Sequence, residues 1–198
     1  MSVILLVRHA AHDNVGKFLA GRMPGVHLGE AGRAQAQRLA ARLKGEGLER
    51  VHCSPRERTR ETAGAIAEAS ALPDPIMAAA LDEIDFGRWS GHDFETLNRD
   101  PDFCRWNAER ATARTPAGES MGQVQARVVD HLDQVARHAS AAPFALVTHA
   151  DVIKAAVCHV LALPLDAWWR FDIAPASITR LETGPQGYRL VGLNDVVW

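Results

Sequence analysis

Apolar positions along this chain fall into short continuous runs and into longer stretches with a helical period, and their order predicts the fold. The runs at 3–7 and 144–147 are short, continuous and apolar, which is typical of strands buried on both faces of a sheet. Weaker strand-like stretches lie at 49–53, 177–181 and 188–193. The pattern therefore predicts a sheet whose strands are distributed along the whole chain.

Stretches with the 3.6-residue period of an amphipathic helix separate these runs. Residues 30–44 place alanine and leucine side chains on one stripe, and two glycines follow as a stop. Ser120 and Gln123 have the spacing of a capping box before a second apolar stripe, and a further helix is expected between His149 and Pro164. Crossover helices between strands predict an α/β fold, a single three-layer α/β/α domain with a mainly parallel sheet and helices on both faces.

One more helix is predicted from Ser54 to about residue 70. Ser54 is expected to cap it, Pro55 to take its first position and Glu57 to complete a capping box. Arg58 then falls in the first turn, and the N-terminus of a helix attracts anions. The alternative is that Arg58 belongs to a solvated basic face.

The segment 91–118 shows no clean period. It mixes arginines with Phe94, Phe103 and Trp106, and we expect it to form a partly helical cap inserted into a single domain that spans residues 1–198. The length fits one α/β domain with one core, and no internal repeat or linker indicates a second. The mixture of side chains is compatible with sugar phosphates, nucleotides or other small acidic esters as ligands.

Composition and charge exclude several classes of function. The chain has 198 residues, 47% of them hydrophobic, and a formal net charge of -2, so nucleic acid is not expected as a partner. Three scattered cysteines argue against a disulfide framework and a zinc knuckle, and they suit a reducing cytoplasm. The first apolar run is too short for a signal peptide or a membrane span. We expect an unprocessed cytoplasmic protein, a monomer or homodimer that does not bind membranes.

Histidines follow the two apolar runs directly. Arg8-His9 follows the first run, and Thr148-His149 follows the second. Ligands in open α/β sheets bind outside the carboxyl ends of the strands, so the two imidazoles are expected to share one pocket. A residue that leaves a buried strand is held rigidly on one side and exposed on the other, as a nucleophile requires.

An acidic run at 82–85 lies among apolar residues and glycines. Desolvation in such surroundings raises the pKa of a carboxyl toward neutrality, which suits a general acid, and Glu83 is the candidate. Asp82 and Asp85 compete for the role, and a surface acidic turn is the alternative.

Taken in order, these segments resemble the histidine phosphatase superfamily, also called the phosphoglycerate mutase-like group. Leu-Val-Arg-His at 6–9 is similar to the opening signature of the family, and 28–36 is similar to the start of its first long helix. The remaining likeness covers 54–63, which is similar to Ser-x-x-x-Arg-x-x-x-Thr-Ala, then 81–91, 116–120 and 146–149.

The resemblance implies a phosphatase that hydrolyses small phosphorylated metabolites. It makes His9 the phosphate-accepting nucleophile, Arg8 and Arg58 phosphate ligands, His149 the second pocket histidine and Glu83 the general acid. Elementary chemistry agrees, because a phosphoryl group that spreads charge over three oxygens needs fixed cationic donors, which Arg8, Arg58 and His149 supply. The two arginines also favour the unprotonated, nucleophilic form of His9. Neither a metal nor a cofactor is expected.

The loop after His9 departs from the family pattern. The family usually continues with Gly-Glu-Thr or Gly-Glu-Ser and has an asparagine six places on, whereas this chain continues with Ala-Ala-His-Asp. In this chain the asparagine is Asn14, five places after His9 and so one place earlier than in the family. A solvated loop is the alternative to substrate contact here. The expected substrate-binding residues outside the catalytic set are Asn14, Arg22 and Thr148, with His12 and Asp13 as further candidates.

Other classes of protein remain open. A phosphoglycerate mutase-type phosphotransferase uses similar residues but excludes water, and the short chain favours hydrolysis. Cys53 near a helix start suggests a cysteine phosphatase, although the position required to be arginine holds Thr59. His9, His12 and His149 with a carboxylate suit a metal-dependent hydrolase. The non-enzymatic alternative is a module that binds phosphate esters without turnover.

Overall fold

A six-stranded sheet runs through the computed structural model, which describes residues 2–138 and 142–196. The strand order is β3-β2-β4-β1-β5-β6, so the first strand lies near the centre and is paired with strands from late in the chain. The strands are β1 (Val3–Arg8), β2 (Arg50–Cys53), β3 (Ile76–Met77), β4 (Phe144–Thr148), β5 (Ser177–Gly184) and β6 (Gly187–Val196).

The sheet is mixed but mostly parallel, as the sequence predicts. Strands β1, β2, β3 and β4 pair in parallel, whereas β5 is antiparallel to both β1 and β6. A short turn joins β5 to β6, and two strands joined in this way are antiparallel. The edge strand β3 is not anticipated by the sequence pattern, because two residues beside prolines carry no period.

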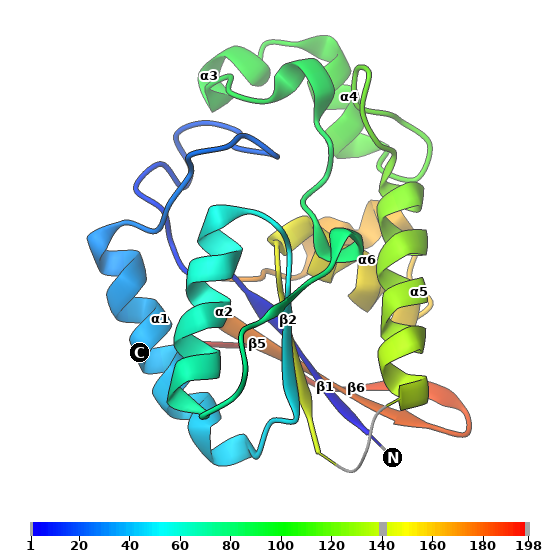
Figure 1. Ribbon diagram of the computed structural model, residues 1–198. Helices are drawn as coiled ribbons and strands as arrows, with labels where there is room; N and C mark the ends of the chain where they lie inside the picture. The colour runs from blue at the N-terminus through cyan, green and yellow to red at the C-terminus, as the bar shows by residue number, and fades with distance from the viewer. Residues whose placement is uncertain (1, 139–141, 197–198) are drawn as a thin grey trace.

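Two pairs of helices cover the two faces of the sheet, as Figure 1 shows. Helices α1 (Glu30–Leu43) and α2 (Glu57–Ala69) pack with the Leu5 and Val7 side chains of β1. Helices α5 (Met121–His138) and α6 (Ala150–Val160) pack with Ile4 and Leu6, which point to the opposite face. The three-layer arrangement therefore follows from the alternation of side chains along a fully buried central strand.

The helix starts test the predicted capping residues. The predicted box before α5 is confirmed, since Ser120 Oγ accepts from Gln123 N at 3.2 Å and Gln123 Oε1 accepts from Ser120 N at 2.9 Å. The predicted cap of α2 is wrong, because that helix begins at Glu57 with Arg56 at the N-cap. Ser54 lies three residues before Glu57, and its hydroxyl contacts the side chains of Asp82 and His149 instead.

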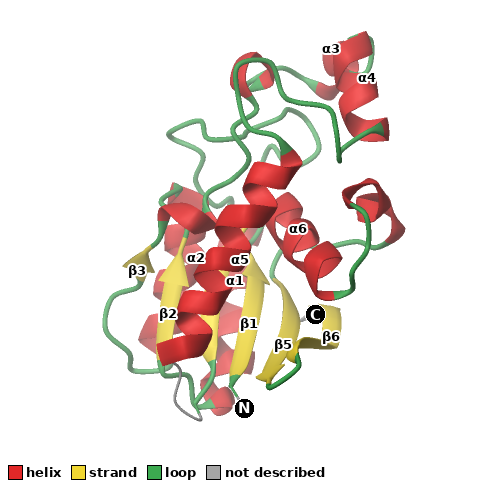
Figure 2. Cartoon of the chain, turned by 90° about the vertical axis from the view of Figure 1, so that its right-hand side faces the viewer, coloured by secondary structure: helices red, strands yellow, loops and turns green. Residues whose placement is uncertain are grey.

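The segment predicted as a cap carries α3 (Phe94–Leu97) and α4 (Pro101–Ala108). Figure 2 shows both helices beyond the carboxyl end of β1. Their core is aromatic, because the buried Phe103 ring packs edge-on against Trp89 with centroids 5.2 Å apart. Short 3-10 helices complete the described chain, namely η1 (Lys44–Glu46), η2 (Ala79–Leu81), η3 (Gly87–Trp89) and η4 (Leu165–Arg170). None of the described helices is long and apolar enough to cross a membrane.

Candidate active site

The two histidines predicted to share a pocket lie side by side. Strands β1 and β4 are parallel neighbours with Arg8 opposite Thr148, so the residue after each strand emerges at the same edge of the sheet. His9 N donates to the carbonyl of Thr148 at 3.0 Å, which ties the two strand ends together. The ring centroids of His9 and His149 are 5.2 Å apart.

Local hydrogen bonding fixes the tautomer of His9. Its Nδ1 lies 2.8 Å from the carbonyl oxygen of Ala10, which can only accept, so the proton is on Nδ1. Nε2 therefore carries the lone pair, and Arg58 Nε donates to it at 3.3 Å. The backbone holds His9 in the orientation in which Nε2 faces the arginine.

Arg58 connects the two imidazoles. Its guanidinium is buried, with only 1% of the residue exposed. Nη2 donates to the carbonyl of Gly21 at 2.8 Å and to His149 Nδ1 at 3.2 Å. Nη1 is buried without a hydrogen-bond partner among the described residues. A buried cationic donor without a partner is costly, so this atom is available for an anion.

The surroundings of His9 keep its imidazole neutral. Burial lowers the pKa of His9 well below its usual value, and the positive charges of Arg58 and Arg8 lower it further. The sequence predicts that the two arginines lower the pKa of His9, but burial of the imidazole lowers it more than they do. The Nη1 of Arg8 donates to the carbonyl of Ile173, while its Nε is buried without a partner among the described residues.

His149 is the N-cap residue of α6 and is completely buried. Its Nε2 donates to Ser54 Oγ at 2.9 Å, and its Nδ1 accepts from Arg58. Burial and the charge of Arg58 lower the pKa of His149 well below its usual value. A neutral imidazole therefore stands where the sequence analysis expects a cationic donor, and the two arginines carry the positive charge.

Glu83 completes the cluster from the loop after η2. Its Oε2 lies 3.5 Å from His149 Nδ1, and its Oε1 accepts from Ile84 N at 2.9 Å. Burial is the main reason that the pKa of the Glu83 carboxyl is raised to about 7, and the negative charge of Asp151 adds to the rise. This agrees with the predicted effect of desolvation. A carboxyl with this pKa exchanges its proton at neutral pH, as an acid-base catalyst requires.

The neighbours of Glu83 explain why it, and not an adjacent aspartate, faces the histidines. Asp82 is held by Arg56, whose Nε and Nη2 lie 2.9 and 3.0 Å from its carboxylate oxygens. The backbone carbonyl of Glu83 accepts from Arg22 Nε at 2.8 Å and from Arg127 Nη2 at 3.2 Å. These arginines fix the loop so that the Glu83 side chain points inward.

A cavity of about 150 Å³ lies at this cluster and is named here the catalytic cavity; Arg8, His9, Arg58 and Glu83 are among its lining residues. Most of the predicted catalytic residues therefore lie together. His149 is buried behind the lining, against Arg58. The titratable lining residues also include His12, a further candidate from the sequence, and Asp151, which the sequence analysis does not single out. Asp151 follows His149 by two residues, but in the sequence it resembles an ordinary acidic residue in the first turn of a helix.

Three predicted substrate-binding residues lie outside the lining of the catalytic cavity. Asn14 is exposed, and its carbonyl accepts from Lys17 N at 3.0 Å. The Arg22 guanidinium is held by Glu119 at 2.8 Å as well as by the Glu83 carbonyl. The hydroxyl of Thr148 donates to the carbonyl of Leu81 at 2.6 Å and is buried. In this arrangement Arg22 and Thr148 position the loops that carry the cluster.

His12 belongs to the catalytic cavity although its role is left open by the sequence. Its ring stacks beside His9 with centroids 6.0 Å apart, and its Nδ1 is buried without a partner among the described residues. Burial and the two arginines lower the pKa of His12 to about 4, so it is neutral at pH 7. A neutral imidazole with an unused nitrogen is a suitable hydrogen-bond partner for a phosphate oxygen.

Replacing His12 tests this contact. We expect His12→Ala to raise KM for a phosphomonoester roughly 10-fold, because a hydrogen bond to a charged group is lost. His27→Ala, at an exposed histidine that is not part of this cavity, is the matched control. Steady-state kinetics of both variants check the expectation, and an unchanged KM in His12→Ala contradicts it.

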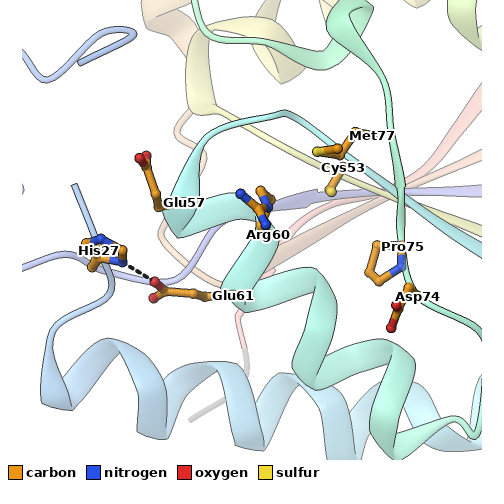
Figure 3. A pocket seen from close by; sticks show the side chains of 8 residues that line it. All are labelled: His27, Cys53, Glu57, Arg60, Glu61, Asp74, Pro75 and Met77. Atoms are coloured by element: carbon orange, nitrogen blue, oxygen red, sulfur yellow. Dashed lines mark hydrogen bonds and ion pairs between the residues drawn. The ribbon is translucent and has the colours of Figure 1, made fainter. Parts of the chain in front are cut away.

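A cavity of about 560 Å³, larger than the catalytic cavity, lies elsewhere, along α2 (Figure 3). Three of its polar side chains, those of His27, Glu57 and Glu61, are engaged with one another or with backbone. His27 contacts Glu61, and the Glu57 carboxylate accepts from Gly25 N at 3.0 Å. Burial raises the pKa of the Cys53 thiol in its wall to about 11, so the thiol is protonated at neutral pH. The cavity therefore lacks the activated thiolate that a cysteine phosphatase requires.

Metal ligation was a further alternative for the histidines. Over residues 2–138 and 142–196, no group of three or more histidine, cysteine, aspartate or glutamate side chains is arranged to hold a metal ion.

The fold and the cluster define an α/β protein with a histidine pair and Arg8 at the ends of two parallel strands and Arg58 in the first turn of α2. Over residues 4–196 the chain matches the histidine phosphatase superfamily (branch 1), and it belongs to this family. This confirms the resemblance.

Similar proteins carry phosphatase names. The chain is 35% identical over 188 residues to phosphoserine phosphatase 1 of Hydrogenobacter thermophilus, covering 92% of this chain and 88% of that protein. It is 33% identical over 182 residues to an acid phosphatase of Mycobacterium tuberculosis, covering 88% and 83% of the two chains. The solved structure of YhfR from Bacillus stearothermophilus has a TM-score of 0.90 and 27% identity, covering 99% of this chain and 98% of that chain. The protein is thus a phosphatase of this superfamily.

Proposed function

We propose that this protein hydrolyses small phosphomonoesters without a metal ion, through a phosphohistidine intermediate on His9. The observation that carries the proposal is the geometry around one imidazole. The Nε2 lone pair of His9 faces Arg58, and Glu83 lines the same cavity, with its Oε2 3.5 Å from His149 Nδ1. A neutral nucleophile, a cationic cradle and a protonated carboxyl are the three components that the reaction needs.

Binding of the phosphoryl group rests on the two arginines. Arg8 and Arg58 each have a buried nitrogen without a partner among the described residues. A phosphate dianion supplies acceptors for both, and its charge compensates the two guanidinium groups. Stabilisation of charge on the transferred group is usually the largest contribution to phosphoryl transfer.

The reaction then proceeds in two displacements. In the first, a bond forms between His9 Nε2 and phosphorus, the ester P–O bond breaks, and the Glu83 carboxyl gives its proton to the departing oxygen. In the second, the Glu83 carboxylate takes a proton from water as the water oxygen attacks phosphorus. The N–P bond then breaks, which releases inorganic phosphate and restores both residues.

Glu83→Gln tests the role of the carboxyl. An amide cannot transfer a proton, so we expect a loss of roughly 10²- to 10⁴-fold for alkyl phosphates. The loss should be smaller in the first step for p-nitrophenyl phosphate, whose leaving group departs without protonation. Equal losses in the first step with both substrates contradict the assignment. Glu68→Gln, at an exposed position of α2, is the control.

The pH profile gives a second readout for the same residue. Because Glu83 has a pKa of about 7, it is protonated below pH 7 and loses its proton above it. The kcat/KM of the wild-type protein for an alkyl phosphate should therefore fall as the pH rises through about 7, and Glu83→Gln should lose this limb of the pH profile.

The same assay tests the metal-independent mechanism, because it includes a strong chelator, and inactivation by the chelator contradicts that mechanism. With 3-phosphoglycerate, mutase turnover far above phosphate release supports a phosphotransferase instead.

A further inference from the structure

A second cavity, of about 310 Å³, adjoins the catalytic cavity and lies under the α3–α4 segment. The two cavities have Leu19, Phe86, Phe94 and Asp151 in common. The second is named here the leaving-group pocket, because it borders the catalytic cavity on the side of Asp151. The catalytic cavity, at about 150 Å³, has about half the volume of this second cavity, at about 310 Å³, so we expect the larger part of a bulky ester to extend into the adjoining space.

The wall of the leaving-group pocket is mainly apolar and rich in aromatic rings. Phe86, Phe94, Phe103 and Trp168 contribute four rings, and Leu19 adds an aliphatic side chain. Phe86 and Phe103 are buried and therefore held in place, which gives a preformed surface. Ligand pockets of this size that are lined by aromatic side chains bind flat apolar groups by burial and stacking.

The charged residues of this wall neutralise each other. Arg110 is only 4% exposed, and its Nη1 lies 3.2 Å from the carboxylate of Asp151. Its Nη2 donates to Asn107 Oδ1 at 2.9 Å, and its guanidinium lies 4.0 Å from the ring centroid of Trp168. Lys154 also lies against the Trp168 ring, at 4.8 Å, but it is not part of the lining. Arg110 Nε is buried without a hydrogen-bond partner among the described residues. The wall therefore presents one cation to a ligand, but Asp151 compensates its charge, so a free carboxylate on the substrate finds no net positive charge there.

Size limits the ligand further. An apolar cavity of about 150 Å³ holds benzene in another protein. The leaving-group pocket, at about 310 Å³, has room for one ring with a short linker or for two fused rings. The side-chain amides of Asn98 and Asn107 at its edge supply hydrogen bonds for uncharged polar atoms.

Building on the proposed function, we propose that the leaving-group pocket takes an uncharged aromatic or heteroaromatic group, so that the preferred substrates are phosphomonoesters carrying such a ring and not phosphorylated amino acids or carboxylic acids. The pairing of Arg110 with Asp151 is the feature that decides between these classes. An unpaired arginine in the same place suits a carboxylate, whereas a neutral pair beside four rings suits an uncharged ring.

Esters of primary alcohols test the proposal without a change in leaving-group chemistry. We compare kcat/KM for 2-phenylethyl phosphate, n-propyl phosphate, O-phosphoserine and 3-phosphoglycerate. Burial of a phenyl ring predicts a preference of roughly 10- to 100-fold for 2-phenylethyl phosphate over n-propyl phosphate. The two acidic esters are expected to react no better than n-propyl phosphate. A kcat/KM for O-phosphoserine or 3-phosphoglycerate above that of 2-phenylethyl phosphate overturns the proposal.

Variants locate the preference in the leaving-group pocket. We expect Trp168→Ala and Phe94→Ala to lower the ratio of kcat/KM for 2-phenylethyl phosphate to that for n-propyl phosphate toward one. Trp169→Ala is the matched control, because Trp169 is the next residue of the same 3-10 helix and is 67% exposed. An unchanged ratio in both pocket variants overturns the proposal. Hydrolysis of all esters without a preference contradicts the proposal alone, whereas no hydrolysis of any ester contradicts the proposed function.

Discussion

His9→Ala is expected to lose phosphatase activity on p-nitrophenyl phosphate by roughly a million-fold, the scale seen when the nucleophile of a covalent enzyme is removed. The Nε2 of His9 carries a lone pair facing Arg58, and His9 lines the catalytic cavity, whereas His149, which also accepts from Arg58, is not among the lining residues. The methyl group of alanine cannot replace this nitrogen. Initial rates at high enzyme concentration measure the loss. Activity close to that of wild type removes His9 from the role of nucleophile.

Two controls separate loss of chemistry from loss of fold. His159→Ala changes an exposed histidine in the last turn of α6 and should leave the rate unchanged. The second control is binding of vanadate or phosphate to His9→Ala, which should persist because Arg8 and Arg58 remain. If His9→Ala neither binds anions nor unfolds cooperatively, its low rate reports a loss of fold and not a loss of catalysis. In that case the rate of His9→Gln, which keeps a polar side chain at this position, is measured instead.

Arg58→Ala is expected to lower kcat about 10²- to 10³-fold, equivalent to about 2.7 to 4 kcal/mol of transition-state stabilisation. Arg58 contacts both imidazoles and has a buried nitrogen without a partner among the described residues, and its charge lowers the pKa of His9. In the proposed mechanism the same charge also stabilises the transferred phosphoryl group. Loss of this charge should also raise the His9 pKa, which moves the acid limb of the pH profile toward neutral pH.

Arg60→Ala is the matched control for Arg58, because it removes a guanidinium from an exposed position two residues later on the same helix. Arg58→Lys keeps the charge but loses the planar fork, so an intermediate rate is expected. A kcat for Arg58→Ala within a few fold of wild type contradicts the assigned role, provided that thermal unfolding shows a folded protein.

The sequence predicts the site best where the backbone alone determines geometry. His9 and His149 each follow a short apolar run that forms a strand. Because the two strands are parallel neighbours, the residues that follow them lie close together at the same edge of the sheet. The same argument holds for the layers, because α1 and α5 show continuous apolar stripes that a sheet must cover. The family resemblance adds the order of the segments and is confirmed over residues 4–196.

Side-chain competition explains what the sequence misses. Ser54 has the pattern of a helix cap, but its hydroxyl contacts His149 and Asp82, and α2 begins three residues later. Arg22 is a reasonable substrate ligand from the sequence, yet three carboxylates and the Glu83 carbonyl surround it. These side-chain contacts join residues far apart in the chain, so the local hydrophobic pattern cannot predict them.

The α3–α4 segment is the part of the fold for which the sequence carries least information. Its helices are short, so the 3.6-residue period does not develop, and its core is built from rings of Trp89, Phe103 and Trp106 that pack irregularly. The pairing of Arg110 with Asp151 spans forty-one residues, and it is the basis for proposing an uncharged ring where the sequence leaves sugar phosphates, nucleotides and other small acidic esters open. This is the point at which the structure adds most to the functional interpretation.

The most direct measurement is to identify the phosphorylated residue during turnover. The variant used is Glu83→Gln, because release of the phosphoryl group from the histidine is expected to be slow in it. This protein is mixed with p-nitrophenyl phosphate and the reaction is quenched in alkali, where phosphohistidine survives and phosphoserine does not. Peptide mass spectrometry should then find one phosphoryl group on His9 and none in a Glu83→Gln protein that also carries His9→Ala. A phosphoryl group on any other residue, or rapid turnover without a phosphorylated histidine, contradicts the mechanism.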